Sequence, residues 1–210
     1  MKSILYIKAS PRGKRSKSTV VADAFIEAYR QMHPDDKVKN LNVFEKLLPA
    51  FDGLTVQAKY TIMHGQEHTK QELDAWKEVE KVIDEFKSAD KYVLATPMWN
   101  FGIPYRLKQY IDILTQPGHT FSWSPDTGYQ GLVTGKPMLA VYARGGEYPG
   151  GTEAQAFDLQ TKYVELIFGF IGFENINSIV VEPTLQGGPD MAKAKVDQAI
   201  EEATALATDF

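Results

Sequence analysis

The arrangement of apolar segments constrains the fold of this chain more than any other feature of its sequence. Short segments rich in β-branched and aromatic residues, typical of buried strands, alternate with longer segments of helical period along 210 residues. Strands that alternate with helices form a parallel sheet covered by helices on both faces. We therefore expect one doubly wound α/β domain over residues 1–210, with five strands in the order 2-1-3-4-5. The strands are predicted at residues 3–8, 37–43, 91–96, 137–143 and 173–181.

The segments between these strands repeat apolar residues three and four positions apart, which is the period of an amphipathic helix. Helices are predicted at residues 18–32, 67–86, 104–114, 152–168 and 190–207, and a weaker pattern within residues 44–66 predicts a short helix around 55–63. Residues 115–136 contain Pro, Gly and aromatic residues but show no such period. A connection of this length inside a compact domain is typical of a functional loop or a lid.

Composition excludes several classes of function. The chain contains no cysteine, so thiol nucleophiles, cysteine-ligated metals and iron–sulfur clusters are ruled out. Its four histidines are scattered and predict no metal site. A net charge of −4 provides no basic field for nucleic acid. No segment reaches the length of a transmembrane helix or resembles a signal peptide, so we expect a cytoplasmic protein and no membrane partner.

The loop after the first predicted strand has the character of a phosphate site. It contains Ser10, Ser16 and Ser18 together with four cationic side chains, and it leads into a helix. Free N–H groups and the positive end of the dipole at a helix N-terminus bind phosphate well. The motifs of P-loop and Rossmann dinucleotide sites are absent. The alternative is a solvated basic turn with Ser18 as the helix cap. The cations are Arg12, Lys14, Arg15 and Lys17.

The loop after the third predicted strand is aromatic. Met98, Trp99 and Phe101 can form apolar walls for a flat ring system, and Asn100 adds an amide and a backbone donor. The alternative is that these residues only cover the sheet edge. Loops after the first, third and fourth strands of a doubly wound sheet meet at one crevice, and this co-location favours a binding site.

The loop after the fourth predicted strand contains Arg144, Gly145 and Gly146. Paired glycines allow a ligand to approach the backbone closely. Their N–H groups can bind the polar edge of a ring and stabilise negative charge that develops there. Read alone, the glycine pair is equally consistent with a flexible turn.

Four motifs along the chain closely resemble the bacterial FMN-dependent NADH:quinone oxidoreductase/azoreductase family. The most specific is the segment Pro-Met-Trp-Asn-Phe-Gly-Ile-Pro at residues 97–104. The resemblance implies a flavodoxin-like fold, FMN as the prosthetic group, NADH or NADPH as the donor, a quinone or azo acceptor, and a homodimer with its site at the subunit interface. The other motifs are Ser-Pro-Arg at 10–12 with Ser-Lys-Ser at 16–18, Gly-His-Thr-Phe at 118–121, and Arg-Gly-Gly at 144–146.

The resemblance also implies roles for individual residues. The phosphate would be held by Ser10, Ser16, Lys17 and Ser18, the ring lined by Met98, Trp99, Asn100 and Phe101, and the pyrimidine side faced by Ala143, Arg144, Gly145 and Gly146. Phe121 and Tyr148 are candidates for the substrate pocket wall or lid. Two residues depart from the family pattern: Trp99 stands where Tyr is frequent, and Ala143 where Ser is common.

The hypothesis for the mechanism places the chemistry at flavin N5, with no side chain as acid–base catalyst. Donor and acceptor would use one pocket in turn, which gives ping-pong kinetics. The alternatives are a flavodoxin-type electron carrier without turnover of its own and another NAD(P)H:FMN reductase. The long segment 115–136 and the modest net charge argue against a carrier, because carriers usually have shorter connections and a strongly acidic face. A signalling receiver with the same strand order is a further alternative. It needs acidic residues after the first strand to bind magnesium, and this chain has Ser-Pro-Arg there.

Overall fold

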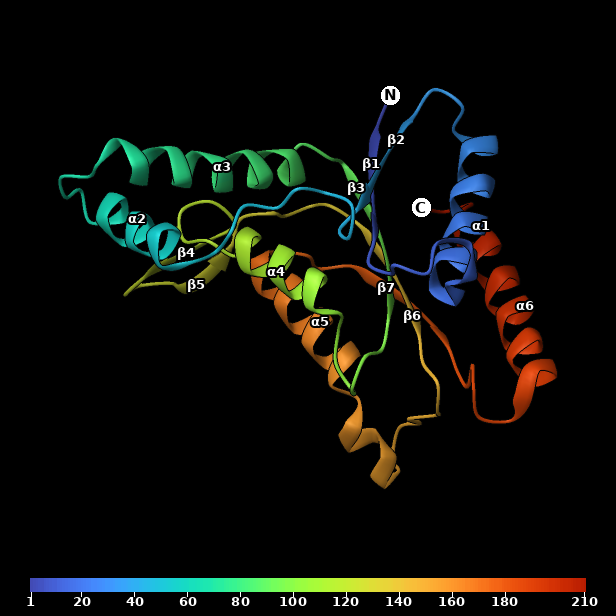
Figure 1. Ribbon diagram of the computed structural model, residues 1–210. Helices are drawn as coiled ribbons and strands as arrows, with labels where there is room; N and C mark the ends of the chain where they lie inside the picture. The colour runs from blue at the N-terminus through green and yellow to red at the C-terminus, as the bar shows by residue number, and fades with distance from the viewer.

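The computed structural model describes residues 1–210 and is built around a five-stranded parallel sheet (Figure 1). Its order, β2-β1-β3-β6-β7, confirms the predicted topology, because β6 and β7 are the fourth and fifth strands of this sheet. Nearly every residue of the three inner strands is buried, as expected for strands covered on both faces. The strands are β1 (Ser3–Lys8), β2 (Lys37–Asn42), β3 (Lys91–Pro97), β6 (Met138–Ala143) and β7 (Ile176–Val181).

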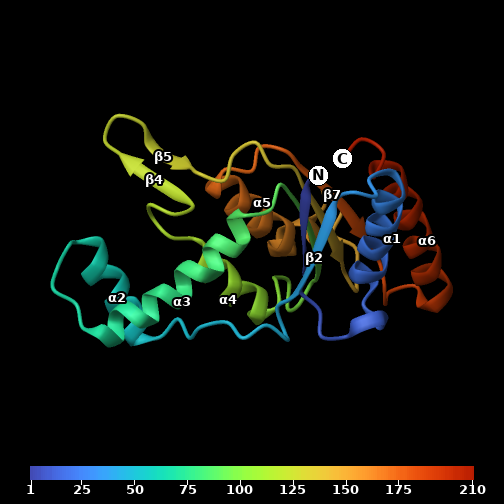
Figure 2. The same ribbon diagram turned by 90° about the horizontal axis from the view of Figure 1, so that it is seen from above.

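The helices cover the two faces of the sheet (Figure 2). On one face α1 (Lys17–Met32) and α6 (Gly188–Leu206) pack against a core that contains Phe25 and Val141. On the other, α3 (Lys70–Lys87), α4 (Tyr105–Leu114) and α5 (Leu159–Ile171) enclose a larger core around Phe86. No helix combines the length and the apolar character needed to cross a bilayer.

The ends of several helices differ from the sequence prediction because capping residues determine them. α3 begins at Lys70 and not at residue 67, since Thr69 and Glu72 form a capping box. The helix predicted at residues 152–168 is divided into a 3-10 helix, η2 (Glu153–Phe157), and α5, which Asp158 caps by accepting the Thr161 N–H at 2.9 Å. α2 (Gly53–Met63) lies beside α3, beyond the edge of the sheet (Figure 1).

Residues 115–136, predicted to have no regular structure, contain an antiparallel hairpin of β4 (Phe121–Ser124) and β5 (Gly128–Gly131). Its strands are four residues long and include two glycines, which is why no periodicity revealed them. The hairpin is fixed to the end of α5: the Val133 N–H donates to the Ile171 carbonyl at 2.9 Å. At Gly131 a Cβ would lie 2.3 Å from the Gly172 nitrogen, so only glycine fits this crossing.

Candidate functional site

The loops at the carboxyl ends of β1, β3, β6 and β7 meet at one crevice, as expected for a doubly wound sheet. The crevice therefore brings together residues from all three loops that the sequence analysis singled out. The fourth loop, with Thr184 and Leu185, was missed, although its position after a parallel strand was a usable signal. The lining residues are Ser10, Arg12, Ser16, Lys17, Pro97, Met98, Trp99, Ala143, Gly145, Thr184 and Leu185.

The first loop presents hydroxyl and N–H groups at the start of α1. Ser16, and not Ser18, is the N-cap: its Oγ accepts the Thr19 N–H at 3.4 Å and lies 3.2 Å from the Ser18 Oγ. The amides of Lys17 and Ser18, in the first turn of the helix, donate to no protein acceptor. Ser10, Ser16 and Ser18 are buried. Hydroxyls and unpaired amides at a helix N-terminus are groups that can bind an anion.

The second loop is a tight turn with unusual backbone angles. Trp99 and Gly102 exchange two N–H to carbonyl hydrogen bonds of 3.0 Å. The residues between them, Asn100 at φ 47° and Phe101 at φ 68°, are the only non-glycine residues with positive φ in the chain. Asparagine tolerates this region but phenylalanine is strained there, and such strain is concentrated at functional sites. The turn leaves the Asn100 and Phe101 amides without a protein acceptor.

The third loop offers amides from its two glycines. The Arg144 amide is occupied, since it donates to the Val181 carbonyl at 3.0 Å, whereas the Gly145 and Gly146 amides have no protein acceptor. The nearest heavy atom to a Cβ built on Gly146 is the Gln186 Oε1 at 3.5 Å. A Cβ at Gly146 would therefore meet Gln186 and Tyr148 at ordinary contact distances. The loop after β7 supports this conformation, because the Leu185 and Gln186 amides donate to the Gly145 carbonyl at 3.1 and 3.0 Å.

The guanidinium of Arg144 is buried in a network of side chains and is not among the groups that line the crevice. Arg144 does not line it and is only 3% exposed, with Asp158 at 2.9 Å and Glu182 at 3.2 Å. Its neighbours Ala143 and Gly145 line the crevice, but Arg144 does not.

Two aromatic groups flank the crevice. Trp99 lies 5.8 Å, ring centre to ring centre, from Phe44 and 6.3 Å from Tyr105. Phe44 follows β2 and was missed, because one aromatic residue in an irregular segment carries no sequence signal. Phe101 meets Tyr148 edge-on at 6.4 Å, so Tyr148 is placed beside the second and third loops.

Phe121 lies elsewhere in this chain. It packs in the hairpin region against Phe170 at 4.8 Å and Tyr129 at 6.0 Å. In Figure 1 the hairpin lies on the side of α2, away from the loops at the carboxyl ends of the strands. The structure therefore does not bring Phe121 together with the other predicted site residues.

A parallel sheet of this order, with an aromatic crevice and unpaired amides at the carboxyl ends of its strands, is characteristic of the flavodoxin-like class of proteins. Residues 2–207 match the family model described as flavodoxin-like fold. An FMN-dependent NADH:quinone oxidoreductase of Nitratidesulfovibrio vulgaris is 55% identical over 100% of both chains. The chain belongs to the FMN-dependent NADH:quinone oxidoreductase family.

Solved structures agree with this membership. An azoreductase from Bacillus anthracis str. Sterne has a TM-score of 0.91 and 32% identity over 100% of both chains. An FMN-dependent NADH-azoreductase from Bacillus anthracis str. Ames Ancestor, crystallised with FMN, has a TM-score of 0.87 and 28% identity, over 99% of this chain and 100% of the other.

Proposed function

We propose that this protein binds FMN in the crevice and uses NADH or NADPH to reduce quinones and to cleave aromatic azo bonds. The observation that carries the proposal is the convergence of unpaired amides, from α1 and from the loops after β3 and β6, on one aromatic crevice. The relatives support it, since they are named for FMN, NADH, quinone and azo reduction. We place the enzyme in the cytoplasm, where nicotinamide nucleotides are available.

The crevice fits FMN part by part. The phosphate would be held by Ser10, Ser16, Lys17 and Ser18 through hydroxyls, helix amides and one ammonium group. The ring would lie against Met98, Trp99, Asn100 and Phe101, with Ala143, Gly145 and Gly146 at its pyrimidine side. Arg144 would contribute through its backbone position only.

The flavin, when bound, supplies the chemistry by transferring two electrons as a hydride at N5 between donor and acceptor. The residues of the chain would bind the flavin, orient it and polarise its ring. The Gly145 and Gly146 amides would stabilise negative charge at the pyrimidine edge, as fixed donors that need no reorganisation. Trp99 and Tyr148 would form the walls against which donor and acceptor stack in turn. One shared position for both substrates gives ping-pong kinetics.

The test is direct. Purified protein should be yellow, or become so when titrated with FMN. Anaerobic NADH or NADPH should bleach the bound flavin, and a simple quinone should restore its colour. Steady NADH oxidation with the quinone would exclude a pure electron carrier, and reduction of free FMN in its place would favour a NAD(P)H:FMN reductase. A protein with no affinity for FMN would refute the proposal.

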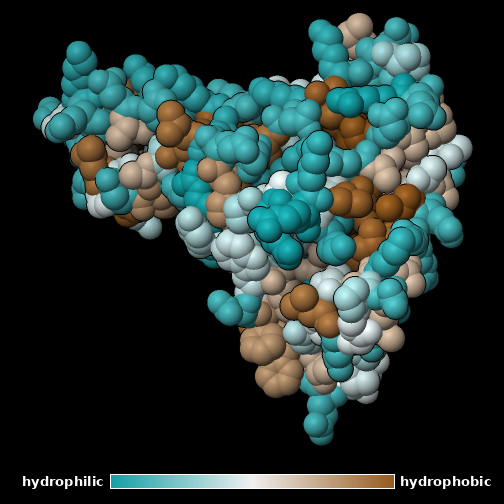
Figure 3. Space-filling view, turned by 45° about the vertical axis from the view of Figure 1, so that its right-hand side comes forward, coloured by the Kyte–Doolittle hydropathy of each residue, from teal (hydrophilic) through white to brown (hydrophobic).

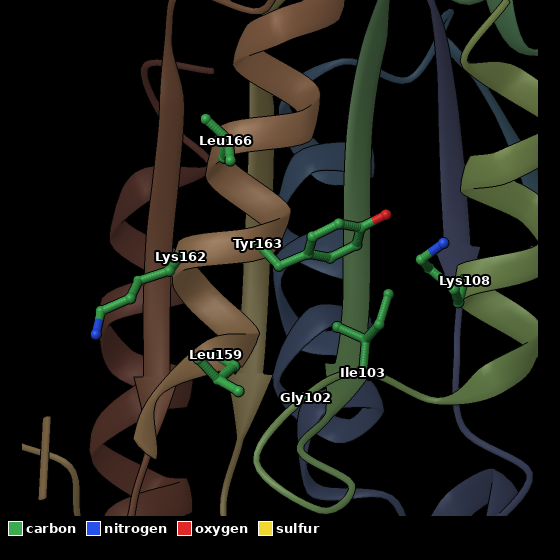
Figure 4. Close-up of a pocket in the computed structure, with 7 residues that line it drawn as sticks. All are labelled: Gly102, Ile103, Lys108, Leu159, Lys162, Tyr163 and Leu166. Atoms are coloured by element: carbon green, nitrogen blue, oxygen red, sulfur yellow. The ribbon is translucent and has the colours of Figure 1, made fainter. Parts of the chain in front are cut away.

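We also propose that the enzyme is a homodimer, joined through an open apolar groove between α4 and α5 (Figure 4). The groove has a volume of about 430 Å³ and begins directly at the Trp99–Gly102 turn. Leu159 and Leu166 of α5 are 54% and 72% exposed. Apolar side chains also gather at the end of the molecule where η2 lies (Figure 3). The groove between α4 and α5 is lined by Gly102, Ile103, Lys108, Leu159, Lys162, Tyr163 and Leu166.

Continuity with the crevice favours a second copy as the occupant, because the resemblance places the active site at a subunit interface. Partial burial works against the charge of Lys108, but its hydrogen bond to Asp112 and the nearby Tyr163 raise the pKa of Lys108 overall. Burial raises the pKa of Tyr163. At neutral pH the groove thus has the Lys108 cation beside the neutral ring of Tyr163, and Lys162 also lines it. In the dimer the partner subunit would bring Phe121 to the crevice that it cannot reach within one chain.

Sedimentation velocity tests the dimer. We expect Leu166→Asp to dissociate it, because the substitution puts a charge in place of an apolar side chain that the partner subunit would cover. The matched control is Leu47→Asp, at a site 96% exposed in another part of the fold. A wild-type monomer at all concentrations, or an unaffected Leu166→Asp dimer, would contradict this interface.

A further inference from the structure

The first turn of α5 contacts both ring-side loops of the crevice. The Leu159 N–H donates to the Phe101 carbonyl at 3.1 Å, at the tight turn after β3. Asp158 accepts from the Arg144 guanidinium at 2.9 Å, at the start of the loop after β6. Gln160, fully buried, joins both: its Nε2 donates to the Thr96 carbonyl and its Oε1 accepts from the Arg144 Nε, each at 3.2 Å.

Arg144 is the central member of this network. Its guanidinium contacts Asp158, Gln160, Thr161 and Glu182, so four side chains fix its position. Glu182 follows β7 and also accepts the Tyr148 N–H at 3.2 Å. A buried arginine with two carboxylates is costly to desolvate, and hydrophobic packing often replaces such groups without loss of stability. The stability of the fold alone therefore does not explain this network. The way in which it connects the loops after β3 and β6 does.

We infer that Arg144 and Asp158 are positioning residues for the flavin. The network fixes the spacing between the Trp99–Gly102 turn and the Gly145–Gly146 amides, which would face two sides of the same ring. Arg144 acts through Asp158 and touches no cofactor itself. The inference rests on the proposed function, because the ring whose binding depends on this spacing is that of FMN.

Asp158→Asn is the informative variant. Asparagine keeps the oxygen that caps α5 at the Thr161 amide, but it removes the charge opposite Arg144. We expect the FMN Kd to rise about tenfold and the visible circular dichroism of bound FMN to change, because the ring is held less firmly. Asp52→Asn is the matched control, because Asp52 caps α2 through the Thr55 amide at 3.1 Å and takes part in no salt bridge. It should leave both readouts unchanged.

A double-mutant cycle completes the test. Arg144→Lys should raise the Kd to a similar extent, and the double variant should bind FMN no more weakly than Asp158→Asn alone. Ser16→Ala, on the phosphate side, should instead be additive with Asp158→Asn. A lower unfolding temperature with an unchanged FMN Kd and dichroism would overturn the inference and leave a structural role. Wild-type protein that fails to bind FMN would refute the proposed function, which is a different result.

Discussion

Replacing Gly146 with alanine separates the requirements of the fold from those of the cofactor. Gly146 does not have positive φ, and a Cβ on it would lie 3.5 Å from the Gln186 Oε1 and 3.8 Å from the Tyr148 hydroxyl, both ordinary contacts. The substitution should therefore leave the protein without FMN as stable as wild type, or more stable by about 0.4–1 kcal/mol through the smaller entropy of the unfolded chain.

The bound state should respond in the opposite direction. In the proposed complex the ring lies against the Gly145 and Gly146 amides beside Tyr148, and a methyl group on Gly146, in contact with Tyr148, would obstruct it. The loss of one or two hydrogen bonds costs about 2 kcal/mol, which raises the FMN Kd about 30-fold. At a concentration 100 times the wild-type Kd, FMN stabilises wild type by about 2.7 kcal/mol, but this variant by about 0.9. The difference lowers the unfolding temperature with FMN by about 4–7 °C.

Fluorescence titration and thermal unfolding, each with and without FMN, measure these two effects. Gly150→Ala is the control: it lies in the same loop, it lacks positive φ, and its Cβ would meet only the Gln155 Nε2 at 3.9 Å. The reasoning is refuted if Gly146→Ala binds FMN as wild type does, or if Gly150→Ala weakens binding equally.

Four further substitutions test other parts of the structure. Ser16→Ala should lower the unfolding free energy by about 1 kcal/mol in urea titrations and weaken FMN binding about 10- to 100-fold, through loss of the cap and of a phosphate donor. Thr69→Ala removes the capping box of α3, so it should cost about 1 kcal/mol with no change in FMN Kd. Gly131→Ala should cost about 2–3 kcal/mol, measured in the same way, because its Cβ would overlap the Gly172 backbone. Asn100→Val should cost about 1–2 kcal/mol and weaken FMN binding, because a β-branched residue does not tolerate φ 47°; unchanged titrations would show that the turn relaxes.

The sheet could be predicted because its signal is local and strong. Strands β1, β3 and β6 are continuous apolar runs, and the alternation with helices restricts the topology. Helix boundaries were less accurate, because a cap such as Thr69 or Asp158 outweighs the apolar period. The hairpin was missed because two four-residue strands are stabilised by contacts with α5, far away in the sequence.

The crevice could be predicted in outline but not in its supporting contacts. The rule that loops at the carboxyl ends of parallel strands converge was sufficient to unite Ser16, Trp99 and Gly145. The orientation of Arg144 was not accessible, because its partners Asp158 and Glu182 lie 14 and 38 positions further along the chain. The roles proposed for individual residues toward FMN remain predictions for the experiments above.

Six backbone amides in the loops around this crevice have no protein acceptor, at Lys17, Ser18, Asn100, Phe101, Gly145 and Gly146. Mutation changes side chains but leaves such donors in place as long as the loops keep their course. Side chains that line the crevice, such as Trp99 and Ala143, can therefore change during evolution while the backbone hydrogen bonds to the ligand are kept. We therefore expect mutations in the crevice to change the range of acceptors more readily than they abolish FMN binding.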